Sequence, residues 1–260
     1  MNRGGSLPLD IDRIIRETFV VQVEHHPTLG STNDRAAQRA THGITTLPLL
    51  VLADQQSAGR GRGSNRWWTG EGALAMSLLV EAEMVGADPG RSPLVALATA
   101  VAVVDTVAPL LPGHEVGIHW PNDVLAAGRK LAGILVEVLP DRRHVIGIGL
   151  NTNNTLADAP AELQTTAATL RDLSSREHDQ TAILVDLLKR LDREFRQLRS
   201  NPAEVAARAD ALCLQRGRTV TLQQGNRTIA GRCRGIGPDG AILLETSAGV
   251  ERFLSGTLTT

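Results

Sequence analysis

The stretch LPLLVLADQQSAGRGRGSNRW, residues 47–67, joins an apolar run to a loop rich in glycine and arginine. The run from Leu47 to Asp54 has the length and composition of a short buried strand. The segment from Ser57 to Arg66, called here the glycine-arginine loop, follows it directly. Glycine lets a backbone approach a ligand closely, and arginine offers forked donors that match phosphate or carboxylate. The sequence therefore predicts a strand that ends in an anion-binding loop.

The loop does not fit the two common nucleotide-binding fingerprints. No Gly-Lys-Ser/Thr follows it, and Ser64 stands where a dinucleotide fingerprint has its third glycine. From the residues alone, two other interpretations of this loop remain: a solvated loop whose arginines aid solubility, and a contact with RNA. The net charge of −1 and the aromatic content of 2% argue against the RNA contact, because both a positive field and stacking side chains are lacking.

The segments around the loop predict a mixed α/β domain. Strands are expected at Phe19–Glu24, Ala73–Val80, a segment ending at Trp120, Leu131–Leu139 and Val145–Leu150. The last two form a hairpin through Asp141–Arg143. Helices are expected at Ser31–Thr41, Pro93–Leu111, Thr181–Leu198 and Pro202–Leu212. The apolar run of the second helix is interrupted by Asp105 and bounded by prolines, which favours a buried core helix over a membrane span.

The pattern of apolar residues changes after Leu214. Short alternating segments separated by glycine-containing turns predict a small all-β unit. They lie at Thr219–Leu222, Thr228–Arg234, Ala241–Glu245 and Val250–Leu254. We therefore expect an N-terminal extension over residues 1–18, a main domain over 19–213 and a β domain over 214–260.

Neither the N-terminal segment nor the cysteines point to secretion. Met1–Glu17 has scattered charges and no apolar core, so it does not read as a signal peptide. Cys213 and Cys233 form no CxxC pair, so neither a zinc site nor a disulfide framework is indicated. A reducing compartment, and hence a cytoplasmic location, is expected.

Three further motifs carry polar groups at the ends of predicted elements. The segment HWPND at 119–123 is followed by an apolar strand, with Lys130 just before the strand and Gly133 within it. A ligand contact and a plain hairpin edge with a packing glycine both fit these residues. The segment STND at 31–34 also reads as a helix N-cap, and GIGLN at 147–151 as a strand leading into a turn.

Together and in this order, the four segments resemble the biotin protein ligases. That family shows Ser-Thr-Asn, Gln-x-Ala-Gly-Arg-Gly-Arg-x-Gly-Arg-x-Trp, Lys-Trp-Pro-Asn-Asp followed by Arg-Lys-Leu-Ala-Gly-Ile-Leu-Val-Glu, and Gly-Ile-Gly-x-Asn. The resemblance covers about residues 19–258. It implies a mixed-sheet α/β catalytic domain of the class II aminoacyl-tRNA synthetase type, followed by a small C-terminal SH3-like β-barrel.

The resemblance implies a role for each matching residue. The expected biotin contacts are Ser31, Thr32, Asn33, Gln56, Arg60, Gly61, Arg62, Lys130, Gly133, Gly147 and Gly149. The expected nucleotide contacts are Gly59, Arg60, Arg62, Arg66, Trp67, Asn122, Lys130 and Asn151. The expected catalytic residues are Lys130, Arg60, Arg62 and Asp123. The first three would converge on one spot and neutralise charge, while Asp123 would guide or deprotonate the attacking amine. No metal ligand is expected among the side chains.

The implied reaction joins biotin to ATP as biotinyl-5′-AMP, with Mg²⁺, and then acylates a lysine of the biotin carboxyl carrier domain of an acetyl-CoA or acyl-CoA carboxylase. No membrane or DNA partner is expected, since the short N-terminal extension leaves no room for a helix-turn-helix. A homodimer stays open. A lipoate or octanoate ligase of the same superfamily and an inactive biotin sensor are the alternatives.

The sequence departs from the family pattern at two places. Ser64 and Asn65 replace the second Gly-Arg pair of the loop, which removes a cation, although Arg66 stands next to them. His119 replaces the lysine before Trp-Pro-Asn-Asp and places a titrating group at the edge of the expected site.

Overall fold

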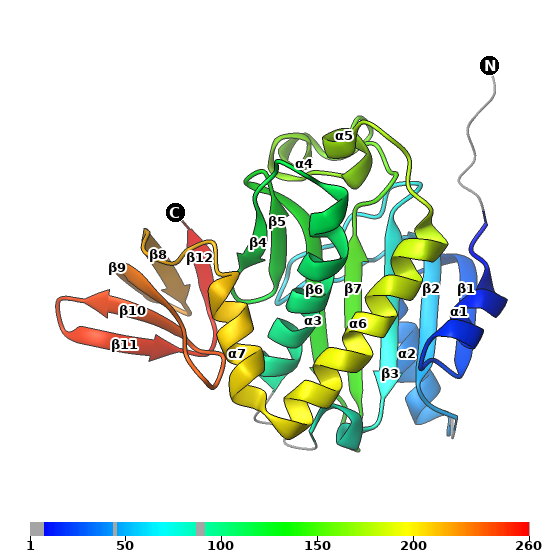
Figure 1. Cartoon of the computed structure of the whole chain (residues 1–260), viewed down its shortest axis with the longest axis horizontal. Coiled ribbons are helices and arrows are strands. Elements are labelled where there is room, and N and C mark those ends of the chain that lie inside the picture. The colour runs from blue at the N-terminus through cyan, green and yellow to red at the C-terminus, as the bar shows by residue number, and fades with distance from the viewer. Residues whose placement is uncertain (1–7, 44–45, 87–91, 260) are drawn as a thin grey trace.

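A computed structural model describes residues 8–43, 46–86 and 92–259. These residues build a large sheet with helices and a second, smaller sheet (Figure 1). The strands of the large sheet are β1 (Gln22–Leu29), β2 (Leu49–Gln56), β3 (Leu74–Val80), β4 (Val116–His119), β5 (Asp123–Ala126), β6 (Arg129–Val138) and β7 (His144–Leu150). They lie in the order β1-β2-β3-β7-β6-β5-β4. Because β1 and β2 are parallel and all other neighbours antiparallel, the predicted mixed sheet is confirmed.

The helices lie on both faces of this sheet. They are α1 (Ile11–Glu17), α2 (Thr32–Thr41), α3 (Ser92–Val107), α4 (Ala161–Thr166), α5 (Leu170–Ser174), α6 (Gln180–Ser200) and α7 (Pro202–Ala211), with 3₁₀ turns η1 (Ala82–Val85) and η3 (Ala108–Leu110). Helices α3 and α6 pack against each other side by side on one face of the sheet (Figure 1). The segment Ser92–Leu110 is long and apolar enough to cross a membrane, but 67% of its most apolar window is buried inside the protein. It is the buried core helix that the sequence predicts.

Successive side chains of a strand point to opposite faces of a sheet, and this alternation separates the core from the site. In β2, Leu50 and Leu52 pack into the main core under α3 and α6, whereas Leu49 and Val51 pack with Ala36 of α2. The strands β3, β6 and β7 alternate in the same way. The side chains of Met76, Ile134 and Ile148 pack in the main core. The opposite face carries Ser77 and glycines in its central part, and Leu79 and Val145 where α2 covers it. The central part of that face is free to hold a ligand.

The first strand is not where the sequence places it. It spans Gln22–Leu29 instead of Phe19–Glu24, because pairing with β2 begins at Gln22. The apolar side chain of Phe19 packs edge-on against Phe195 of α6, with ring centroids 6.5 Å apart. The apolar residues before the strand therefore anchor it to a helix. The sequence did not predict the short elements α1, α4, α5 and β5, because segments of seven residues or fewer are too short to show a helical or strand periodicity.

The second sheet is antiparallel and follows α7. Its strands are β8 (Thr219–Gln224), β9 (Arg227–Ile236), β10 (Ile242–Thr246), β11 (Gly249–Phe253) and β12 (Thr257–Thr259), in the order β11-β10-β9-β8-β12. The fifth strand, β12, was not predicted. The sheet is tied to the large domain by buried Trp120, whose indole Nε1 donates to the carbonyl of Gly240 at 2.9 Å. This docking places the start of β12 beside the glycine-arginine loop.

Candidate active site

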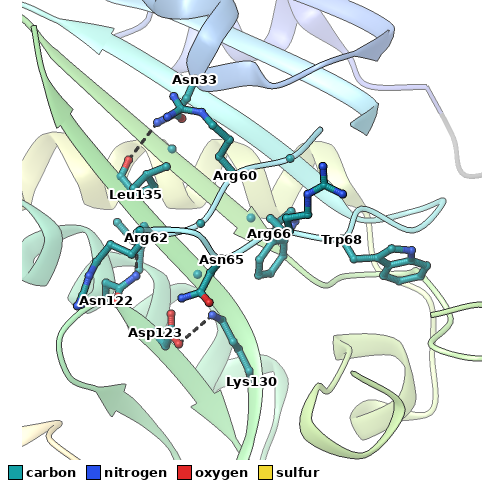
Figure 2. A pocket seen from close by; sticks show the side chains of 18 of the residues that line it. Asn33, Arg60, Arg62, Asn65, Arg66, Trp68, Asn122, Asp123, Lys130 and Leu135 are labelled. Atoms are coloured by element: carbon teal, nitrogen blue, oxygen red, sulfur yellow. Dashed lines mark hydrogen bonds and ion pairs between the residues drawn. The ribbon is translucent and has the colours of Figure 1, made fainter. Parts of the chain in front are cut away.

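A cavity of about 960 Å³ lies on the face of the large sheet that carries the small and polar residues (Figure 2). Its walls are the first turn of α2, the glycine-arginine loop, β6 and β7, and the residues around the start of β12. This volume lies at the upper end of the range of small-molecule sites. The cavity can therefore hold an elongated ligand with two parts.

The structure brings almost all predicted site residues to this cavity. The lining includes Ser31, Thr32, Asn33, Gln56, Gly59, Arg60, Gly61, Arg62, Arg66, Trp67, Asn122, Asp123, Lys130, Gly133, Gly147 and Gly149. Asn151 is not part of it. Its side chain is buried, and its Oδ1 accepts from Asn154 Nδ2 at 3.2 Å. The geometry thus gives Asn151 a role in holding the segment after β7 and does not support a direct nucleotide contact.

The floor of the cavity is made of glycines because neighbouring side chains occupy the space above them. Gly133 pairs directly with Gly149 across β6 and β7. A Cβ on Gly149 would lie 2.6 Å from Cζ2 of Trp67, and one on Gly147 would lie 2.9 Å from Cγ of Asn33. Real Cβ atoms essentially never come this close. Glycine at these positions therefore admits Trp67 and Asn33 to the sheet surface.

A chain of hydrogen bonds runs beneath the cavity and fixes its polar end. The backbone N–H of Thr32 donates to Gln56 Oε1 at 2.8 Å, and the Thr32 hydroxyl lies 2.8 Å from Ser77 Oγ. Ser77 donates to Asn33 Oδ1 at 2.6 Å, and Asn33 Nδ2 donates to Glu137 Oε2 at 2.7 Å. All but Gln56 and Glu137 are buried. The amide of Asn33 is thus held in one orientation from both sides.

Ser31 caps α2 by position, but its hydroxyl makes no capping hydrogen bond. Its side chain is buried and lines the cavity. A plain helix cap would use this hydroxyl on the N–H groups of the first turn. The hydroxyl is available to a ligand instead. Helix capping therefore does not explain the serine at position 31.

Of the three expected site cations, Arg60 contacts α2, through Asp34. Its guanidinium donates to both carboxylate oxygens of Glu137, at 2.9 and 2.6 Å, and lies 2.8 Å from Asp34. The hydrogen bonds to Glu137 raise the pKa of Arg60, and burial opposes this. Because Glu137 also accepts from Asn33, it links the loop to the polar end of the cavity.

Arg62 reaches the other end of the cavity. It donates to Asn122 Oδ1 at 3.2 Å and to the carbonyl of Gly256 at 2.6 Å. Burial lowers the pKa of Arg62, and the nearby carboxylate of Asp123 opposes this. The second domain therefore holds the loop directly, through a backbone oxygen just before β12.

Lys130 lies at the start of β6, with its Nζ 2.8 Å from Asp123 Oδ2 and 5.8 Å from the ring centroid of Trp67. The chain has only two lysines among 27 basic residues, and the other is Lys189 on α6. Arg60, Arg62 and Lys130 thus share one cavity, but in this structure each is bound to a different internal partner (Figure 2). They do not meet at a single point as the sequence reasoning expects.

Three contributors to the site were not assigned from the sequence. Ser77 has one signal, a single hydroxyl in the otherwise apolar strand Leu74–Val80. Glu137 belongs to a recognised motif, but the sequence gave it no role. Gly256 carries no signal, because only the docking of the second sheet brings its carbonyl to Arg62. Within the described residues, no group of three or more His, Cys, Asp or Glu could hold a metal ion.

Comparison with known proteins finds relatives for most of the chain. Residues 27–153 match the Biotin/lipoate A/B protein ligase family, and residues 217–257 match the Biotin protein ligase C terminal domain. The biotin–[acetyl-CoA-carboxylase] ligase of Mycobacterium tuberculosis is 36% identical over 92% of this chain and 90% of its own length. The bifunctional ligase/repressor BirA of Bacillus subtilis is 31% identical over 90% of this chain and 72% of its own length.

The fold agrees with these relatives. The biotin protein ligase from Aquifex aeolicus, solved in complex with biotin and ATP, superposes with a TM-score of 0.79 at 24% identity, over 92% of this chain and 98% of that one. At this identity the likeness shows the fold alone, while the two sequence relatives match over most of their length. The chain therefore belongs to the biotin protein ligases, within the biotin/lipoate A/B protein ligase family.

Proposed function

We propose that this enzyme activates biotin with ATP as biotinyl-5′-AMP and then transfers the biotinyl group to a lysine of a carboxylase carrier domain. One observation carries the proposal: a single cavity combines a glycine floor, a fixed polar end and the three cations Arg60, Arg62 and Lys130. The names of the relatives support biotin as the acyl group, and acetyl-CoA carboxylase is the acceptor in the name of one of them.

The polar end of the cavity suits the ureido group of biotin. A cyclic urea offers two N–H donors and one carbonyl acceptor. The free hydroxyl of Ser31 and the fixed groups of Thr32 and Asn33 lie where such a ring would be bound. Trp67 and Asn33 cover the glycine floor in this structure, and we propose that the fused rings of biotin pack beside Trp67.

In the first step, a carboxylate oxygen of biotin attacks the α-phosphorus of ATP, and the bond to the pyrophosphate oxygen breaks. The carboxylate is already ionised at neutral pH, so this step needs no base. Its barrier comes from bringing two anions together, and cations fixed in place lower it. Arg60, Arg62 and Lys130 can do this once ligand oxygens replace the internal acceptors that hold them in this structure.

ATP carries Mg²⁺ on its phosphates, and we propose that this ion enters as part of the nucleotide. When bound, it adds further neutralisation of phosphate charge. The protein's own contribution is the glycine-arginine loop, which folds back on itself through a bridge between Arg60 and Arg66 and a hydrogen bond from Trp67 N to Gly59 O at 3.0 Å. A covered site is needed because water hydrolyses the mixed anhydride.

In the second step, the lysine amine of the carrier attacks the acyl carbon, the bond to the phosphate oxygen breaks and AMP leaves. We propose that the carrier protein is the macromolecular partner and not a nucleic acid, since the net charge is −1. We also propose a cytoplasmic location, because Cys213 and Cys233 are both free thiols.

Mass spectrometry of a purified carrier domain tests the function directly. Incubation with the enzyme, biotin and ATP should add one biotinyl group to one lysine. Lipoate in place of biotin should give no product, because the polar end of the cavity is matched to a ureido ring. A lipoyl adduct without a biotinyl adduct would assign the enzyme to the lipoate branch of the family.

A further inference from the structure

His119 ends β4 and stands directly opposite Asp123 in the β4–β5 pairing. Side chains of directly opposed residues lie on the same face of a sheet. Both line the cavity, on the wall that also contains Lys130. The imidazole is half-buried, and it makes no hydrogen bond or ion pair with any residue that the structure describes. It is therefore a cavity-facing titratable group that the adenylation step leaves unused.

The charged groups that face His119 come from three elements. Asp123 lies on β5, Lys130 on β6, and Arg62 on the loop, held to neighbouring Asn122. Burial lowers the pKa of His119; Asp123 opposes this and Lys130 adds to it. The imidazole is accordingly neutral at neutral pH and carries a free lone pair. In the carboxylate of Asp123, Oδ2 is engaged by Lys130 at 2.8 Å, while Oδ1 is buried with no hydrogen-bond partner among the described residues.

We propose that His119 is the general base of the transfer step, accepting the proton that the carrier lysine loses as its nitrogen attacks the acyl carbon. The inference rests on the proposed function and deepens it. The carrier amine reaches its neutral form by losing a first proton to solvent. The new C–N bond then forms, the second proton passes to a ring nitrogen of His119, and AMP leaves with the electrons of the C–O bond. Asp123, directly opposite in the strand pairing, supplies the negative charge beside it.

This role distinguishes the chain from the family pattern that it resembles. The pattern has a lysine at this position, and an ammonium group cannot accept a proton. A neutral imidazole can, and a general base contributes about 10²- to 10⁴-fold to a proton-transfer step. The substitution should therefore make transfer, and not adenylation, depend on the ionisation of one histidine.

Single-turnover transfer tests the proposal. The enzyme is first loaded with biotin and ATP, and carrier domain is then added while biotinyl transfer is followed from pH 5.5 to 9. Biotin-dependent pyrophosphate exchange is measured on the same preparations. The variants are His119→Gln and His119→Lys, and His114→Gln is the control, because His114 is exposed and does not line the cavity.

Both His119 variants should transfer about 100-fold more slowly than the wild type, with exchange within threefold of it. Because the carrier amine must be neutral to attack, the logarithm of the transfer rate should rise with pH at slope one below the pKa of that amine. Protonation of His119 should make the transfer rate fall more steeply at the acid end of the pH range. Both His119 variants should lose this additional fall, and His114→Gln should keep it.

Transfer within threefold of wild type in His119→Gln, or an unchanged acid limb, would overturn the proposal. Equal loss of exchange and transfer would also overturn it, since it would show a structural role. Failure of the proposed function is a separate result: the wild-type enzyme itself would then show no biotin-dependent exchange.

Discussion

Gly147 offers a direct way to disturb the polar end of the cavity without removing a polar group. A Cβ at this position would overlap the amide of Asn33. The residue therefore cannot become alanine unless Asn33 leaves its place. Moving Asn33 breaks its hydrogen bonds with Ser77 at 2.6 Å and with Glu137 at 2.7 Å.

The cost of the change follows from those two bonds. A neutral hydrogen bond contributes about 1 kcal/mol net, and one to a charged group about 1.5–3 kcal/mol. Gly147→Ala should thus cost at least about 2 kcal/mol of folding stability, and the displaced amide of Asn33 is no longer available to biotin. Losing one hydrogen bond between Asn33 and biotin should cost about 1.4 kcal/mol, so the dissociation constant for biotin should rise about 10-fold.

Isothermal titration calorimetry with biotin measures this effect, and thermal unfolding checks that the variant is folded. Gly30→Ala is the matched control, because a Cβ there meets nothing within 4 Å, although Gly30 directly precedes Ser31. Its affinity should equal that of the wild type. If folded Gly147→Ala bound biotin as tightly as the wild type, the placement of the ureido group beside Asn33 would be wrong.

The remaining predictions concern charge. Lys130→Ala should abolish biotin-dependent pyrophosphate exchange while Lys189→Ala leaves it unchanged; near-normal exchange without Lys130 would remove that residue from the mechanism. Arg62→Ala should weaken biotin binding and speed the loss of adenylate to solvent, both measured with radiolabelled biotin, and two unchanged values would refute the loop assignment. Burial lowers the pKa of His144, partly opposed by the backbone of Arg142, so the unfolded chain binds this proton more tightly and stability falls as pH drops below about 6.5. His144→Leu should lose less thermal stability between pH 7 and pH 5 than the wild type, and an equal loss would contradict this.

Local patterns were sufficient for the elements that build most of the cavity. The hairpin of β6 and β7 was predicted because two apolar runs flank a short polar turn, and the structure pairs Gly133 with Gly149 across it. The glycine-arginine loop was predicted because its composition is unusual over ten residues. The first strand was misplaced because the most apolar residues near it, such as Phe19, pack against a helix and not within the sheet.

What the sequence could not supply are contacts between distant segments. The carbonyl that holds Arg62 comes from Gly256, 194 residues away. Ser77 is one hydroxyl in a strand, and its importance depends on Asn33 lying above it. Asn151 belongs to a recognised motif, but its side chain accepts a hydrogen bond from Asn154. The motif identified the segment correctly without showing the orientation of this side chain.

The scarcity of lysine affects which amines an escaped acyl-adenylate can modify. An acyl-adenylate that escaped before reaching its acceptor would react with whichever primary amines it met. On this enzyme, Lys189 lies on α6, behind the sheet and 3.1 Å from Glu17, and Lys130 is held inside the cavity by Asp123. Arginine carries nearly all the remaining positive charge and is inert to acylation. An enzyme with a leaky loop should consequently label neighbouring proteins while remaining almost unlabelled itself.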